Sequence, residues 1–586
     1  MSELHRRLLR DVPERRAPKA GDFATETRAM RSWVAALPMA NFLASAHMLV
    51  NGLRAMNALR ISPGERIDAL EIMRGPVNQL AALVDKQIVG ASFPLPPQRA
   101  ELGTLAQEFQ SELALGYRMA LHDYCAPNGN VPLLKGKAVG LAAARALVHA
   151  GARLHKAYLL YRTPPKGSWQ SLHDVYRFTA SLGLESRTVD DAAAGAATPR
   201  QIYAHAVLLA LANPYRFTQR ELLDAIAFTR VLAPYGELRR VAGGKAAHPI
   251  EVDADRGPGY LPEERTSVDD GVLELDLAPV LAFIEEQVAA LPPGIQLLTL
   301  RARAAAPMQI DVELARRIVD GWTSDGTRGH RRLAGGYTLQ TVIGLHDLHF
   351  VLAGNEDFDS FLRRVRGTTI SLSERDTAAA WAIGSSEQMR TQRMPARIVD
   401  QGLGGYRLLW ERGSGGENVR AKVGELVGLA VAEGGNGAPD WMAGTVRWMR
   451  IGDDGRVDAG VELLARRALA IGVRALDAAG NAHPDMRGIL LQPLRAEETA
   501  VYGSLLTPGL FEREPAGIEL TLPADPHRWP SAPSVLRVQG AGAMDSTGSY
   551  LLFALPPLDL PEDGIDGDDD GAVGGRRPAL AGAGPA

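Results

Sequence analysis

The sequence predicts a multidomain α+β protein with an N-terminal all-helical array, a small antiparallel β-barrel and further C-terminal β structure. Apolar residues recur every three or four positions from Trp33 to about Gly243, which is the period of an amphipathic helix. Short segments of period two, separated by Gly and Asp, fill residues 396–464, and this pattern is typical of a small antiparallel barrel. The length of 586 residues exceeds what one hydrophobic core accommodates, so several domains are expected.

The composition limits the functions that are open to the chain. Lys and Arg number 64 and Asp and Glu number 68, and this net charge of −4 argues against bulk binding of nucleic-acid polymers or anionic membranes. Cys125 is the one cysteine, which excludes an internal disulfide and a thiolate metal cage. The first residues lack the apolar core of a signal peptide, and no segment offers the roughly 20 apolar residues of a membrane span. We therefore expect a cytoplasmic protein whose anion sites are local arginine clusters.

The N-terminal part is predicted to be a flexible, charged leader at residues 1–32 and a helical domain at residues 33–245. Ser62 is placed to cap one helix, and Thr218 with Glu221 three residues later forms a capping box for another. The pattern favours an antiparallel array of tetratricopeptide-like hairpins, although no clean 34-residue period is present. Such an array without a catalytic cluster is more often a protein-docking scaffold than an active site. The helices are expected at residues 43–56, 67–84, 98–123, 135–161, 169–182, 199–212 and 218–232.

The remaining chain divides into four predicted parts. Residues 246–322 are expected to be a linker with a mixed α/β segment, and residues 323–475 are expected to form the barrel, with a largely helical insertion at residues 355–390. The region 476–560 is rich in strand patterns and would form a second β domain or extend the first. The Gly- and Asp-rich tail at residues 561–586 has no apolar pattern, so disorder is expected there. The barrel strands are expected at residues 337–345, 396–400, 406–410, 423–431, 443–450 and 458–464.

A glycine-rich turn lies between the second and third of these strands. It reads D-Q-G-L-G-G from Asp400 to Gly405. Arginine pairs of the form R-x-x-x-R occur at two places before it: Arg328 with Arg332, which enclose Arg331, precede the first strand, and Arg393 pairs with Arg397.

The strand order, the arginine motif and the glycine turn together resemble the PilZ domain, the bacterial receptor module for cyclic di-GMP. PilZ domains carry R-x-x-x-R just before the first strand and D/N-x-S-x-x-G on the turn after the second. Asp400 and Gly405 match the second motif, whereas Gly402 stands at the position of the serine. This difference deletes one hydroxyl hydrogen bond, worth roughly 0.5–1.5 kcal/mol. The resemblance covers about a quarter of the chain and implies a degenerate PilZ barrel.

The resemblance also implies which residues hold the ligand. Cyclic di-GMP is a dianion with two guanines, and a planar guanidinium can chelate a phosphate or a guanine edge and stack on a base. Arg328, Arg331 and Arg332 are expected to be the ligand arginines because they precede the first strand. They act with Asp400 and the turn that contains Gly402 and Gly405. The second choice is Arg393 with Arg397, since Arg397 lies inside the strand that the motif should precede.

Other candidate sites are set aside. His346 and His349 invite a metal interpretation, but on a strand these positions point to opposite faces, so no metal site is predicted. Residues 415–418 only faintly resemble a diguanylate cyclase signature, and no nucleotide or hydrolase motif sits between a strand and a helix. Trp410, Trp441 and Trp448 are expected to be barrel core or rim.

The sequence therefore predicts a non-catalytic cyclic di-GMP receptor with no cofactor and no metal. Nucleotide binding would be coupled to a protein-docking helical region, and the unknown protein partner would bind there. The resemblance implies a role in type IV pilus function, motility or biofilm control, since L-L-A-L-A-N-P-Y-R at residues 208–216 is similar to segments in such proteins. The alternative is a ligand-free adaptor whose PilZ-like barrel is a relic.

Overall fold

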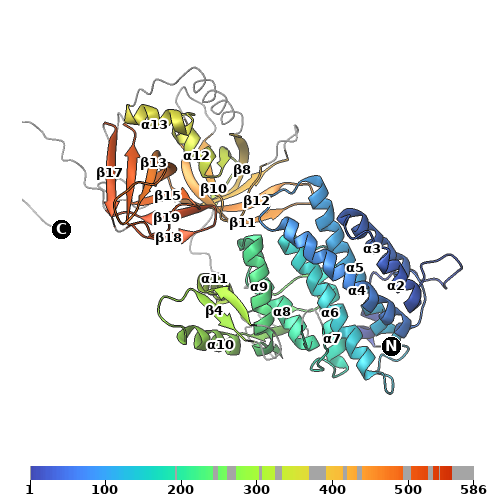
Figure 1. Ribbon diagram of the computed structural model, residues 1–586. Helices are drawn as coiled ribbons and strands as arrows, with labels where there is room; N and C mark the ends of the chain where they lie inside the picture. Colours follow the sequence, from blue (N-terminus) through green and yellow to red (C-terminus); the bar gives the residue numbers. More distant parts are fainter. Residues whose placement is uncertain are drawn as a thin grey trace, which may run out of the picture.

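A computed structural model of the chain describes residues 2–191, 195–241, 248–259, 272–301, 307–323, 333–367, 391–412, 419–431, 439–492, 503–524, 532–539 and 541–556. A bundle of helices lies on one side of the molecule, and two β structures lie on the other (Figure 1). One of these is a closed six-stranded antiparallel barrel, and the other is a further sheet formed by C-terminal strands. The predicted fold class is confirmed.

The helical region forms where the apolar period and the capping residues predict it. The Ser62 side chain accepts a hydrogen bond from the Glu65 amide at 3.2 Å, and Thr218 and Glu221 form the capping box of the last long helix. The first two helices are α1 (Glu3–Arg7) and α2 (Thr27–Ala35). The others are α3 (Phe42–Asn57), α4 (Pro63–Ile88), α5 (Pro97–Cys125), α6 (Gly136–Leu159), α7 (Ser168–Ser181), α8 (Pro199–Leu211) and α9 (Gln219–Leu232), with 3₁₀ turns η1 (Pro214–Arg216) and η2 (Ala233–Tyr235). None of the helices in the described ranges could serve as a membrane span.

Residues 2–32 differ from the predicted flexible leader because they pack on the helical region. Leu8 is fully buried, and the His5 ring stacks on His122 with 4.2 Å between the ring centroids. Arg15 forms an ion pair with Asp123 at 2.5 Å. Because this segment carries many charges, its sequence pattern did not indicate these contacts.

A small α/β unit follows the helical region. Its strands β1 (Glu237–Arg240), β3 (Val272–Asp276) and β2 (Pro249–Glu251) form an antiparallel sheet, and β4 (Leu297–Leu300) pairs with β5 (Met308–Asp311). The helices of the unit are α10 (Ala278–Ala289) and α11 (Val312–Thr323). Trp322 fixes the unit to the helical region, because its indole N–H donates to the Leu208 carbonyl at 2.9 Å.

The barrel strands form at the period-two segments that the sequence predicts. Hydrogen bonds join them in the order β8-β7-β10-β11-β12-β9, and the pairing of β8 with β9 closes the barrel. The short strand β6 (Leu333–Ala334) pairs with the end of β8. The barrel strands are β7 (Thr338–Ile343), β8 (Met394–Gly402), β9 (Gly405–Trp410), β10 (Leu426–Val431), β11 (Met442–Ile451) and β12 (Val457–Ala465).

Two described helices lie between β7 and β8, and the first of them packs into a hydrophobic cluster that the barrel and the C-terminal sheet share. They are α12 (Leu345–Leu352) and α13 (Phe358–Arg366). The strand predicted through His346 and His349 is wrong, because Gly344 adopts a positive φ of 93° and turns the chain from β7 into α12. The His349 ring nitrogen Nε2 lies 3.1 Å from the Ile471 carbonyl, so α12 contacts the C-terminal sheet directly.

The C-terminal β region forms its own seven-stranded antiparallel sheet, in the order β17-β16-β13-β14-β15-β19-β18. Ile471, Leu490 and Leu520 belong to a separate hydrophobic cluster on this sheet. Among the described strands, no hydrogen-bonded pair joins it to the barrel. The strands are β13 (Ala468–Leu476), β14 (Met486–Leu491), β15 (Ser504–Pro508), β16 (Gly517–Leu522), β17 (Ser534–Gln539), β18 (Ala543–Ser546) and β19 (Tyr550–Ala554).

The barrel and the helical region share one continuous hydrophobic cluster. Phe93 and Ala421 exchange two backbone hydrogen bonds of 2.9 Å, and the Ile451 amide donates to the Tyr161 carbonyl at 2.8 Å. Tyr215 of η1 lies under Arg450 of β11, with 4.4 Å between the guanidinium carbon and the ring centroid. The barrel is therefore held against the helices by backbone as well as side-chain contacts.

Candidate ligand-binding face of the barrel

The hairpin between β8 and β9 carries the aspartate and the glycines of the predicted motif. Gly402 pairs with Gly405, so Leu403 and Gly404 form the two-residue tip, and Leu403 is 72% exposed. Gly405 has φ of +155°, and a Cβ there would overlap the Val461 carbonyl of β12. Only glycine allows β9 to approach β12 so closely, which means that the fold alone already requires the last residue of the motif.

Asp400 lies in a row of outward-facing residues that crosses four strands. Asp400 pairs with Arg407 of β9. Arg407 pairs with Gly460 of β12, and Gly460 pairs with Trp448 of β11. A Cβ at Gly460 would overlap the Trp448 indole, so the absence of a side chain there lets the ring lie flat on the barrel wall. Leu408, the neighbour of Arg407, points into the core, because successive residues of a strand face opposite sides.

Arg407 is the cation of this row. Its Nε and Nη2 atoms donate to the two carboxylate oxygens of Asp458 at 2.9 and 2.7 Å, and its Nη1 lies 3.9 Å from Asp400 Oδ2. The guanidinium also lies 6.0 Å from the centroid of the Trp448 ring. The hydrogen bonds to Asp458 raise the pKa of Arg407. The result is a fixed, planar, charged group beside the hairpin.

A second row lies next to the first and adds two more arginines. Arg450 of β11 pairs with Asp458, Asp458 pairs with Leu409, and Leu409 pairs with Arg397 of β8. Arg397 is exposed, and within the described ranges no carboxylate lies at ion-pair distance from it. Its guanidinium is available to an external anion.

The structure brings together only part of the predicted ligand set. Asp400, Gly402, Gly405 and Arg397 share the hairpin and its strand. Arg393 lies at the opposite end of β8, about 20 Å from Asp400 at the usual rise of about 3.3 Å per residue.

There the Arg393 guanidinium donates to the Asn355 side chain and lies 5.8 Å from the Trp441 ring. Arg393 therefore belongs to a different surface from the hairpin. The preferred arginines Arg328, Arg331 and Arg332 lie outside the described residues. The next residue in the chain, Leu333, pairs with Gln401 of β8, beside the hairpin.

Sequence reasoning missed Arg407 and Asp458, and it assigned Trp448 to the barrel core or rim without a role in the site. The signal that could have found them is the alternation in G-Y-R-L-L-W at residues 405–410, which places Arg407 on the outer face. The partners of Arg407 come from strands far along the chain, so their identity depended on the register of the barrel.

The structure shows what surrounds the histidines and tryptophans that were set aside as candidate sites. His349 is buried, and this burial lowers its pKa to about 3, while His346 contacts the adjacent Asp347 at 3.0 Å. No group of three potential metal ligands occurs among the residues that the structure describes. Trp410 lies in the barrel core, Trp441 is buried and Trp448 lies on the outer face. Residues 415–418 lie outside the described ranges.

Comparisons with known proteins agree with this architecture. Residues 28–242 match the family model for the N-terminal domain of the cyclic-di-GMP receptor FimW. Residues 249–393 and 382–469 match the model for the middle PilZ domain of FimW. The chain is 24% identical over 588 residues to the cyclic-di-GMP receptor FimW of Pseudomonas aeruginosa, and the match covers 91% of each protein. No solved structure matches the chain. The predicted resemblance to PilZ domains is thereby confirmed, and the chain belongs to the PilZ-domain family, with an N-terminal region similar to that of FimW.

Proposed function

We propose that this protein is a cytoplasmic, non-catalytic receptor that binds cyclic di-GMP on the outer face of the barrel, at the β8–β9 hairpin. The observation that carries the proposal is the gathering of Asp400, Arg397 and Arg407 on one face, at a hairpin of the PilZ type. The similarity to a protein named as a cyclic-di-GMP receptor supports the same ligand.

Each group on this face suits one part of the dinucleotide. Arg397 has no carboxylate partner in the described part of the chain and is free to hold a phosphate. Arg407 and Trp448 form a flat surface on which a guanine can stack. Asp400 can accept hydrogen bonds from the N–H groups of a guanine edge.

The segment with Arg328, Arg331 and Arg332 supplies the remaining charge in this proposal. It joins the barrel at Leu333, which pairs with Gln401 next to the hairpin. Three guanidinium groups placed there would neutralise the two phosphates and cover the ligand from the side opposite Trp448. Binding would then hold this segment against the barrel.

Titration calorimetry of the full chain with cyclic di-GMP tests the proposal, with GTP and cyclic AMP as controls. We expect selective binding by the wild type and about 10- to 100-fold weaker binding by Arg332→Ala, because a charge-assisted hydrogen bond contributes roughly 1.5–3 kcal/mol. Arg393→Ala is the matched control and should bind as the wild type does, since Arg393 lies at the far end of β8. Undiminished affinity of a folded Arg332→Ala variant would refute the assignment of the arginines.

The outcome for the wild type decides between two functions. Absence of both heat and thermal shift would overturn the receptor and favour a ligand-free adaptor. Gly402 at the serine position and the pairing of Arg407 with Asp458 are the features that favour this second function. Selective binding would exclude the adaptor.

The proposal includes a route from the ligand face to the helical region. Trp448 and Arg450 are two residues apart on β11 and face outward, and Arg450 lies on the ring of Tyr215. The Tyr215 hydroxyl donates to the Arg162 carbonyl at 2.9 Å. Tyr215 belongs to η1, which connects α8 with α9, so a shift of β11 would reach both helices. We propose that these helices present a docking surface for a protein partner in pilus, motility or biofilm control.

Hydrogen exchange tests this route. In the wild type, cyclic di-GMP should change the protection of residues 208–217, because ligand binding alters the β11 contact. In Tyr215→Leu the change should be strongly reduced while the affinity for cyclic di-GMP stays within a few-fold, since the lost cation–π contact is worth only about 0.5–2 kcal/mol. An equally large protection change in this variant would show that the coupling does not pass through Tyr215.

A further inference from the structure

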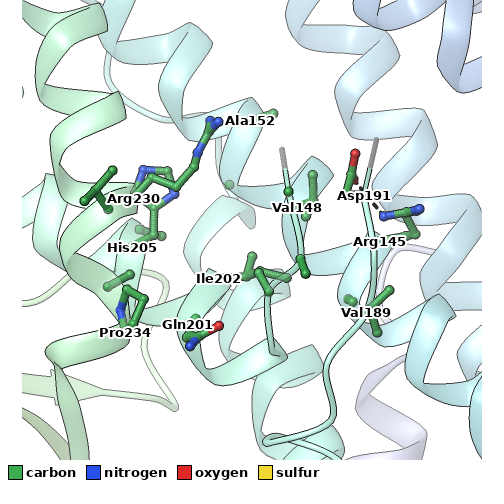
Figure 2. A pocket seen from close by; sticks show the side chains of 18 of the residues that line it. Arg145, Val148, Ala152, Val189, Asp191, Gln201, Ile202, His205, Arg230 and Pro234 are labelled. Atoms are coloured by element: carbon green, nitrogen blue, oxygen red, sulfur yellow. Dashed lines mark hydrogen bonds and ion pairs between the residues drawn. The ribbon is translucent and has the colours of Figure 1, made fainter. Parts of the chain in front are cut away.

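The helical region contains a cavity of about 560 Å³ that the receptor function does not use. It lies between α6, α8 and α9, with η2, residues 189 and 191 and residues 195–197 completing the wall (Figure 2). The volume falls within the roughly 300–1,000 Å³ typical of small-molecule sites. Small side chains at Ala144, Gly151, Ala152 and Ala206 leave the space open.

The cavity has one cation without a partner. Arg230 lines it with a side chain that is partly open to solvent, and in the described chain no carboxylate lies at ion-pair distance from this group. Partial desolvation by the neighbouring protein lowers the pKa of Arg230, and the charge of Asp191 acts in the opposite direction. Asp191 is already bound by Arg74 at 2.6 Å and by Arg145 at 2.7 Å. Figure 2 shows the Arg145–Asp191 pair on one side of the cavity and Arg230 with His205 on the other.

Two neutral imidazoles accompany Arg230. The Nε2 atom of His155 is buried and has no hydrogen-bond partner among the described residues. The rings of His155 and His205 lie 5.0 Å apart, and the Nε2 atom of His205 lies 3.0 Å from the Ile226 carbonyl. Burial lowers the pKa of His205 to about 3 and that of His155 well below its usual value. Both rings are therefore uncharged at neutral pH, and a buried donor without a partner costs roughly 1–3 kcal/mol.

We infer that this cavity binds a small organic anion, whose carboxylate or phosphate is held by Arg230 and the His155 ring. A negative group there would give Arg230 its missing counter-charge and His155 its missing acceptor. The apolar body of the ligand lies against Val148, Ile202 and Tyr235, which line the same cavity. The mixture of apolar walls and a few convergent polar groups is what orients small ligands in general.

Two probes distinguish the kinds of anion. Decanoate carries a carboxylate and phenyl phosphate carries a phosphate, and each has an apolar body of suitable size. Calorimetric titration of the full chain should show one saturable site for at least one of the two probes. The probe that binds identifies the anionic group, while binding of neither overturns the inference.

Variants locate the site. Arg230→Gln should weaken probe binding at least about tenfold, because one charge-assisted contact is lost. Arg220→Gln is the matched control, since Arg220 is an exposed arginine on the same helix and does not line the cavity. Ala152→Leu, which fills the cavity from α6, should also abolish binding while the helical circular dichroism is retained. Wild-type affinity in Arg230→Gln would overturn the inference. The probes and variants differ from those used for cyclic di-GMP, so either proposal can fail alone.

Discussion

Lowering the pH from 7 to 5 is expected to destabilise this protein by several kcal/mol. Four buried histidines, His149, His173, His205 and His349, have their pKa values lowered by burial to about 3, 4, 3 and 3. In the unfolded chain a histidine has a pKa near 6.5. Between these values the unfolded state takes up protons and the folded state does not, so stability falls as the pH falls.

The size of this effect follows from the number of groups. Each histidine contributes about 1.4 kcal/mol per pH unit below its unfolded pKa, and four contribute about 5 kcal/mol per unit. Domain stabilities are typically about 5–15 kcal/mol, so unfolding is expected in mildly acidic solution. Carboxylates held in ion pairs change the free energy of unfolding only at lower pH. The pKa of Asp485, which is bound by Arg366 and Arg474, is lowered to about 2.

Urea unfolding at pH 7, 6 and 5 measures the effect. His349→Gln should reduce the pH dependence, because one of the buried histidines no longer titrates. His47→Gln is the matched control, since the His47 side chain is about half exposed. Equal free energies of unfolding at pH 7 and pH 5 would contradict the prediction.

Replacement of Asp191 by asparagine is expected to cost about 3–5 kcal/mol of stability. The Asp191 carboxylate lies between Arg74 and Arg145, and all three side chains are at most 10% exposed. Removing it leaves two buried guanidinium groups, each of which still forms an ion pair with Glu71 in the described chain. Breaking a buried ion pair from one side carries a large penalty, because the uncompensated charge stays in the interior.

Chemical denaturation of Asp191→Asn measures this penalty. The control is Asp190→Asn at the neighbouring residue, whose side chain is exposed and should tolerate the change. Asp191→Asn combined with Arg145→Met should recover part of the loss, because it also removes one uncompensated charge. A destabilisation below 1 kcal/mol in the single variant would show that the network is solvated in solution.

The features that sequence could predict are those with local causes. The hairpin at Asp400 to Gly405 was predictable because a tight turn needs glycine at a fixed position, and the positions of the barrel strands along the chain followed from period-two segments between turn residues. Helix starts at Ser62 and Thr218 followed from capping chemistry that acts within four residues.

The features that sequence could not predict depend on distant contacts. The short apolar segment around His346 fits a strand and a helix equally well, and the turn at Gly344 decided in favour of a helix. The wall formed by Arg407, Asp458 and Trp448 exists only through the pairing of three strands. Packing of the charged N-terminal segment through His5 likewise required a distant partner, His122.

The continuous cluster beneath the barrel has an evolutionary consequence. Phe93 of the helical region shares backbone hydrogen bonds with Ala421, and buried side chains from both regions fill one core. Genetic recombination that moved the barrel alone into another protein would strip this apolar floor and leave it open to water. The two regions are therefore expected to be inherited together, with substitutions on one side of the contact compensated on the other, so that this receptor evolves as a unit instead of a portable module.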